Sequence, residues 1–244
     1  MRIFITSKDG KVINTTEDWR KFAPPMNPKQ WQEYRSAQEL AKSIFDNKTF
    51  VPKITSVLER FNIPVPEEMH GIPEKATKLL WGKSGNRKHD LFLKDNNSTI
   101  VIGIEAKADE PFDKSVKDKR KIAKKNADGG KNMSARLDGI LNYLYNNYPP
   151  DNKEDLMYQL LSATAGVILE AEDKKINQAC VMFLIFNSDR LDENKKKKNE
   201  EDWQKFCKTM NLDVNGGIIN IQGVDCLIIK EQIELYSNDN PSNL

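Results

Sequence analysis

A hairpin of two apolar strands is the feature of this sequence that most constrains its fold. The stretch "HDLFLKDNNSTIVIGIEAKA", residues 89–108, holds two apolar runs separated by the turn formers at 95–98. Turn formers between two such runs predict antiparallel strands. The second run, 100–104, carries no charge, as expected of a strand buried on both faces. The hairpin therefore predicts a sheet covered by helices and containing at least one antiparallel pair.

The second strand ends in an acid and a base, Glu105-Ala106-Lys107. Side chains two positions apart on a strand project from the same face, so Glu105 and Lys107 should do so. The length of the turn permits Asp90 on the first strand to lie nearly opposite Glu105. We therefore expect two carboxylates and one ammonium to meet at this end of the hairpin.

The rest of the chain alternates helical and strand patterns. An N-terminal hairpin with an Asp9-Gly10 turn precedes a first helix, and the prolines between 52 and 73 indicate turns around one short helix. Further helices and strands follow the apolar hairpin, which predicts an α/β fold with a mixed central sheet flanked by helices. The expected helices are 28–46, 55–61, 133–148, 153–172 and 200–210, and the expected later strands are 178–186 and 225–235.

Length and composition favour a single domain spanning 1–244. The 38 basic residues nearly balance 36 acidic ones, for a formal charge of +2, so any site for a polyanion must be local. A Lys-rich stretch near 114–131 should be an exposed insertion, and the C-terminal residues form a polar tail. The lysine runs 114–125 and 195–198 are typical of solvated loops, which are also where phosphate contacts form.

The chain lacks the sequence features of membrane insertion and secretion. Its longest apolar run is too short to cross a bilayer, and its first residues lack the apolar segment of a signal peptide, so we expect a cytoplasmic protein without a membrane partner. Cys180, Cys207 and Cys226 are odd in number and widely spaced, which argues against disulfides and structural zinc. We expect them to be small buried residues.

Two carboxylates beside an ammonium are chemically suited to a divalent cation. Carboxylates this close repel each other, and a bound metal relieves that repulsion. Mg²⁺, with Mn²⁺ as an alternative, suits Asp90, Glu105 and the carbonyl of Ala106, because it retains waters and takes further oxygens from phosphate. Lys107 would then orient and activate the attacking water and offset charge growing on the phosphate.

The arrangement of Asp90 followed by Glu105-x-Lys107 resembles the PD-(D/E)xK, or restriction-endonuclease-like, nuclease superfamily. The resemblance extends over about Trp31 to Phe186 and is closest to an uncharacterised bacterial family within that superfamily. It is carried in order by the segments "YRSAQELA", "HDLFL", "IGIEAKADEPF", "ARLDGIL" and "YQLLSATAG".

The resemblance implies a restriction-endonuclease-like core of α-β-β-β-α-β type and Mg²⁺-dependent cleavage of phosphodiester bonds, with DNA as the expected partner. It implies the roles given above for Asp90, Glu105 and Lys107. Cutting both strands of a duplex would need two sites, which makes a homodimer attractive, although no interface is legible. Two departures from the pattern are His89, where the superfamily has proline, and Ala163, where exonuclease-like members have tyrosine four positions after the glutamine. The alternative function is a catalytically inactive module that binds nucleic acid or protein on the same fold.

Several further residues have two interpretations each. Glu39 could complete the metal shell, or it could form a capping box with Ser36. Tyr158 and Gln159 could reach the site or the substrate, or pack on the sheet. His89 is expected to tune Asp90 or to be an ordinary strand residue. Asp109 and Glu110 are expected to form a solvated strand end.

Overall fold

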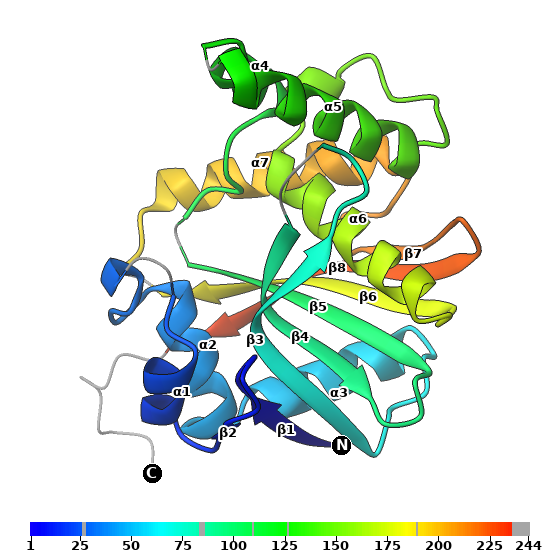
Figure 1. The fold of residues 1–244 in the computed structure, drawn as a ribbon. Coiled ribbons are helices and arrows are strands. Elements are labelled where there is room, and N and C mark those ends of the chain that lie inside the picture. The colour runs from blue at the N-terminus through cyan, green and yellow to red at the C-terminus, as the bar shows by residue number, and fades with distance from the viewer. Residues whose placement is uncertain (26–27, 83–85, 109, 126, 189, 236–244) are drawn as a thin grey trace.

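The protein is an α/β fold built on one eight-stranded mixed sheet with seven α-helices in the described chain, which confirms the predicted fold class. The computed structural model describes residues 1–25, 28–82, 86–108, 110–125, 127–188 and 190–235. Figure 1 shows helices on both sides of the sheet, with α4 and α5 standing above the remainder. No helix among the described residues is long and apolar enough to span a membrane.

The sheet has the strand order β2-β1-β3-β4-β5-β6-β8-β7. The pairs β1–β3, β5–β6 and β6–β8 are parallel, and the pairs β1–β2, β3–β4, β4–β5 and β7–β8 are antiparallel. The predicted apolar hairpin is β4–β5, and the predicted N-terminal hairpin is β1–β2. The strands are β1 Arg2–Thr6, β2 Val12–Ile13, β3 Glu68–Lys78, β4 Asn86–Asp95, β5 Ile100–Lys107, β6 Gln178–Asn187, β7 Gly217–Ile221 and β8 Val224–Glu234.

Two apolar cores lie on the two faces of this sheet. One core joins the sheet to α1, α2 and α3, and the other joins it to α5, α6 and α7. Cys180, Cys207 and Cys226 are buried in these cores as free thiols, as predicted. The helices are α1 Thr16–Phe22, α2 Ser36–Phe45, α3 Phe50–Arg60, α4 Val116–Lys125, α5 Ala127–Leu144, α6 Tyr158–Asp173 and α7 Glu193–Thr209, with short 3-10 turns at Pro28–Gln30 and Lys153–Asp155.

Strand β3 was not predicted, because its sequence contains Pro73 and was interpreted as turns. Proline lacks a backbone N–H and is tolerated in a sheet where that N–H has no partner. Strand β1 pairs with β3 only from Glu68 to Gly71, so Pro73 lies where β3 is an edge on that side. On its other side β3 continues to pair with β4 past Pro73. Strand β3 therefore accommodates Pro73, a residue that is otherwise unfavourable in strands, because this part of β3 is an edge on one side.

Other boundaries differ from the predictions. The first long helix begins at Ser36 instead of residue 28, after a 3-10 turn. The Lys-rich stretch contains helix α4, of which Val116 and Ala123 are buried, so it is more ordered than an insertion loop. The predicted polar tail, residues 238–244, lies outside the described residues.

Helix α6 crosses the sheet unusually closely, because glycines lie at the crossing. A β-carbon added at Gly103 of β5 would lie 2.3 Å from Val167 Cγ2, and one added at Gly166 would lie 2.7 Å from Thr77 Oγ1. Both distances are too short for a real contact, so these positions require glycine. The close approach brings the start of α6 against the ends of β4 and β5.

Candidate active site

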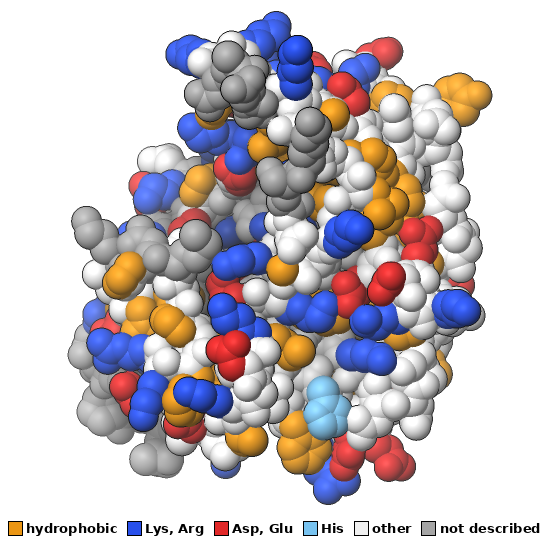
Figure 2. All heavy atoms as spheres, in the orientation of Figure 1, with side chains coloured by type: hydrophobic (Ala, Val, Ile, Leu, Met, Phe, Trp, Pro, Cys, Tyr) orange, Lys and Arg blue, Asp and Glu red, His pale blue; other side chains and the backbone are white. Residues whose placement is uncertain are grey.

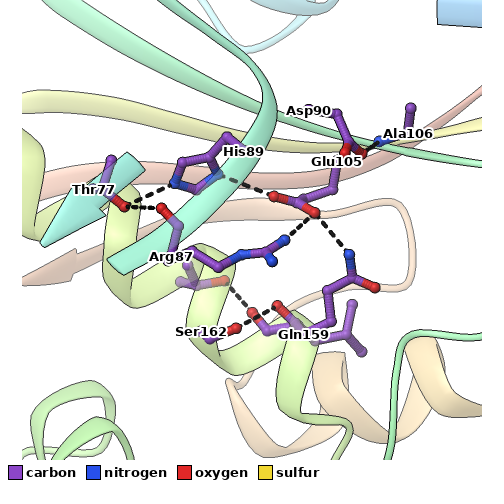
Figure 3. A network of polar contacts seen from close by, with 10 residues as sticks. Thr77, Arg87, His89, Asp90, Glu105, Ala106, Gln159 and Ser162 are labelled. Atoms are coloured by element: carbon purple, nitrogen blue, oxygen red, sulfur yellow. Dashed lines mark hydrogen bonds and ion pairs between the residues drawn. The ribbon is translucent and has the colours of Figure 1, made fainter. Parts of the chain in front are cut away.

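Glu105 is a fully buried carboxylate held by three side chains from two elements. His89 Nδ1 lies 3.0 Å from Glu105 Oε1, and Gln159 Nε2 donates to Oε2 at 2.8 Å. The Arg87 guanidinium forms an ion pair with the same Oε2. Figure 3 shows Arg87 and His89 on β4 and Gln159 at the start of α6 converging on this carboxylate. Glu105 therefore links β4, β5 and α6.

The charges around Glu105 determine its protonation state. Burial alone would raise the pKa of Glu105, but the Arg87 charge and the hydrogen bond from His89 outweigh it and lower the pKa to about 2. Burial lowers the pKa of His89, against the pull of Glu105, so His89 is neutral and carries its proton on Nδ1 toward Glu105. Its Nε2 faces Thr77 Oγ1 at 3.2 Å. His89 thus supports Glu105, whereas the sequence had associated it with Asp90.

Asp90 lies beside Glu105 but faces a different environment. Its Oδ2 accepts the backbone N–H of Ala106 at 2.7 Å, and no described residue donates to its Oδ1. Desolvation and the nearby charge of Glu105 raise the pKa of Asp90 to about 7, although Lys107, Arg87 and the Ala106 N–H act in the opposite direction. The two carboxyls therefore differ widely in proton affinity, with Glu105 ionised and Asp90 titrating near neutrality.

The geometry of β4 changes at Asp90. The observed β4–β5 register runs from Leu91↔Ile104 to Lys94↔Val101 and ends one residue before Asp90, so Asp90 and Glu105 follow the last pair on their two strands. Strict alternation along β4 from Phe92 would place the His89 side chain on the sheet face opposite α6. His89 instead packs with Phe92 and beside Gly103, so its side chain lies on the α6 face. The shift directs His89 toward α6, the face on which Glu105 already lies by alternation with Val101 and Gly103, and Asp90 bonds to the Ala106 N–H.

Lys107 and Asp90 line a common cleft of about 330 Å³. Lys107 is only 9% exposed, and no carboxylate in the described chain lies within ion-pair distance of its Nζ. Arg87 also lines the cleft, and its Nε has no hydrogen-bond partner among the described residues. Tyr158 and Gln159 of α6 complete one wall, and Ser36 and Ala37 of α2 lie on another. The cleft therefore places Arg87 and Lys107 beside Asp90, and the carboxylates of Glu74, Glu110 and Asp113 also line it.

Tyr158 and Gln159, the residues expected to reach the site or substrate, both line this cleft. Gln159 acts through its bond to Glu105, and the Tyr158 ring lies 4.9 Å beneath Lys119 Nζ of α4. Neither contact involves a substrate.

Glu39 lies apart from this cleft. Its carboxylate accepts the Tyr34 N–H at 2.9 Å, lies 3.6 Å from Lys42 Nζ, and lines a separate cavity. The capping-box interpretation is wrong, because helix α2 has Arg35 at its N-cap and the Glu39 carboxylate bonds Tyr34 rather than Ser36. The arrangement does not bring Glu39 to the oxygens of Asp90 and Glu105.

Glu110 is better ordered than a solvated strand end. Its carboxylate accepts the Ala108 N–H at 2.7 Å and the Ser36 hydroxyl at 3.2 Å, and it lines the cleft. It joins the end of β5 to the start of α2. Asp109 lies outside the described residues. Sequence reasoning also missed Arg87, whose spacing of two from His89 was the available signal that both share a face.

The donor set fits a hard divalent cation that keeps most of its water. Asp90 Oδ1 is open, Glu105 Oε1 retains one lone pair, and the carbonyl of Ala106 faces the same neighbouring strand as its N–H, toward Asp90. The described residues contain no cluster of three or more His, Cys, Asp or Glu side chains able to hold a metal. Mg²⁺ needs only one or two protein carboxylates when phosphate and water supply the rest.

Comparison with protein-family models relates this site to a family. The model described as "Domain of unknown function (DUF6946)" matches residues 12–236, a range that includes Arg87, Asp90, Glu105, Lys107 and Gln159. The chain belongs to this family. Searches of curated proteins and of solved structures found no match for this DUF6946 chain.

Removing Arg87 from the DUF6946 chain should strongly destabilise it. Arg87→Met leaves the buried Glu105 carboxylate without its cation, which should lower the free energy of unfolding by about 3–5 kcal/mol. Glu105→Gln in the same background should recover part of that loss, because a neutral amide needs no cation. Denaturant unfolding measures both effects. Arg20→Met is the control, because Arg20 and Glu17 form an exposed pair at 3.9 Å worth less than about 1 kcal/mol. Equal losses in the two arginine variants would contradict the assignment of Arg87.

Asp90 should make the stability of metal-free protein depend on pH. Its folded pKa of about 7 exceeds the unfolded value of 3.8, so the stability it contributes is present below pH 4 and is lost as pH rises toward 7. Asp90→Asn should therefore gain about 1–3 kcal/mol over wild type at pH 8, with a smaller gain at pH 5.

Denaturant unfolding in EDTA at both pH values measures this difference. Exposed Asp173→Asn serves as the control. If the gain from Asp90→Asn is the same at pH 5 and pH 8, Asp90 does not titrate in this range.

Proposed function

We propose that this protein is a divalent-metal-dependent nuclease that hydrolyses phosphodiester bonds in DNA, on a restriction-endonuclease-like core of the PD-(D/E)xK type. The single observation that carries the proposal is the placement of Asp90 and Lys107 in one cleft at adjacent strand ends, with Lys107 Nζ free of any carboxylate within ion-pair distance in the described chain. A buried lysine without an acidic partner, facing a cleft, is suited to an anionic substrate.

The order of elements supports the core assignment. Helix α2 or α3, strands β3, β4 and β5, helix α6 and strand β6 follow one another in the order expected for an α-β-β-β-α-β core, with α4 and α5 inserted before α6. The proposed reactive residues come from the two central strands β4 and β5. Adjacent strand ends can hold side chains in a fixed relation, which hydrolysis of a phosphodiester requires.

Each residue of the site would have a separate role. Asp90, with Glu105 and the Ala106 carbonyl, would hold Mg²⁺ or Mn²⁺, which when bound would polarise a phosphoryl oxygen and neutralise phosphate charge. Lys107 would orient the attacking water and stabilise charge developing on the phosphate. Arg87 would hold Glu105 ionised. Gln159 and His89 would position Glu105.

A specific observation also favours the second candidate, a catalytically inactive module that binds nucleic acid or protein. Both oxygens of Glu105 already accept donors from the protein, and Arg87 neutralises its charge internally. Calorimetry separates the two candidates. DNA or partner binding without any heat from millimolar Mg²⁺ or Mn²⁺ would favour the inactive module.

Cleavage by purified protein tests the nuclease proposal. With Mg²⁺ or Mn²⁺ the wild type should cut at least one member of a panel of single- and double-stranded DNA, and EDTA should abolish cutting. Lys107→Ala should reduce the rate by about 10²-fold or more, because it removes the group that orients the water. Lys208→Ala, on the exposed surface of α7, is the matched control and should cut like wild type. Equal cleavage by Lys107→Ala and wild type would show that the site is wrongly assigned.

A further inference from the structure

A second hollow adjoins the candidate active site. It is a groove of about 580 Å³ between the end of α1 and strands β3 and β4. Glu74 lines both this groove and the Asp90–Lys107 cleft, so the two hollows lie next to each other. Pro24 lines the groove and the adjacent Pro25 lines the cleft. A ligand long enough to pass Glu74 would occupy both hollows.

The groove has an apolar floor. Phe22 and Pro24 lie on the α1 side, and Ile72 and Pro73 lie on β3. The Phe22 side chain packs on the core while remaining partly exposed. A rigid ring bordered by two prolines is a surface on which a flat, aromatic ligand can stack.

Lysines surround this floor. Lys8, Lys75 and Lys88 line the groove. Lys11 Nζ and Lys21 Nζ lie over the Phe22 ring, 5.0 and 5.3 Å from its centre, so a base that stacks on this ring must displace one of these flexible side chains. Glu74, 3.6 Å from Lys88, is the one acid among the described residues that line it. Figure 2 shows Lys and Arg side chains over the middle of the face in view, interspersed with Asp and Glu. The groove is therefore apolar at its base and cationic at its rim.

An apolar floor within a cationic rim complements unpaired nucleotides in particular. Unpaired bases offer a flat apolar face next to an anionic phosphate, whereas a duplex hides those faces in its stack. The volume of the groove lies within the range of ordinary ligand sites. The charge and shape of the groove therefore match a single strand better than a duplex.

We propose that this groove binds an unpaired base and its flanking phosphate in a single-stranded segment of DNA, adjacent to the bond in the Asp90–Lys107 cleft. The proposal rests on the nuclease function in one respect, that the strand continues into the cleft. Phe22 supplies the stacking surface. Lys8 and Lys88 supply the phosphate contacts.

Binding in EDTA, where no cleavage occurs, tests the groove separately from the chemistry. Fluorescence anisotropy with a labelled 15-nucleotide oligo(dT) and a duplex of equal length measures both affinities. Wild type should bind the single strand more tightly, Lys8→Glu/Lys88→Glu should weaken that binding at least tenfold, and Phe22→Ala should weaken it about fivefold or more. Circular dichroism and thermal unfolding of each variant show whether it folds.

Lys205→Glu/Lys208→Glu on α7 carries the same charge change on the opposite side of the sheet, outside the lysine run 195–198, and is the matched control. Equal loss of binding in the control, or equal or tighter binding of the duplex, would overturn the groove. Single-strand binding that depends on Lys8 and Lys88, without any cleavage in Mg²⁺ or Mn²⁺, would support the groove while refuting the nuclease. If the wild type cleaves DNA but the groove variants bind the single strand as tightly as wild type, the nuclease is supported and the groove is refuted.

Discussion

The buried ion pair between Arg87 and Glu105 is the interaction on which the arrangement of the site depends. An ionised carboxylate in a protein core is tolerated only when it is paired and hydrogen-bonded. Glu105 meets that requirement through Arg87 and His89 of β4 and Gln159 of α6. These bonds hold the ends of β4 and β5 and the start of α6 together. The glycines at the crossing of α6 permit the approach that makes them possible.

The same pairing separates the roles of two neighbouring carboxyls. Arg87 and His89 keep Glu105 ionised, while burial and the charge of Glu105 raise the pKa of Asp90 to about 7. Two neighbouring titratable groups whose environments shift their pKa values apart are typical of catalytic sites. Asp90 also faces a cleft where Lys107 lacks an ion-pair partner within the described chain. A bound cation would neutralise Asp90, and a substrate phosphate would pair with Lys107.

The sequence predicted the parts of this site that depend on local pattern. Alternation and turn residues were enough to predict the β4–β5 hairpin and the proximity of Asp90 to Glu105. It could not predict that Arg87 pairs with Glu105, because that contact depends on the shift in β4 at Asp90. Strand β3 was missed because Pro73 opposes strand structure locally, and only the early end of β1 removes the conflict. The position of Glu39 on its helix was compatible with a metal ligand, but its side chain accepts a hydrogen bond from the Tyr34 N–H.

Asp90 and Lys107 are proposed to form a reactive pair beside Glu105, whose carboxylate is bonded by Arg87, His89 and Gln159. Anomalous diffraction from crystals soaked in Mn²⁺ tests this most directly. The account predicts an anomalous peak in the Asp90–Lys107 cleft, coordinated by Asp90, with Arg87 and Gln159 still bonded to Glu105. A cleft without a peak at saturating Mn²⁺, or a peak coordinated by Glu39 instead, would contradict it.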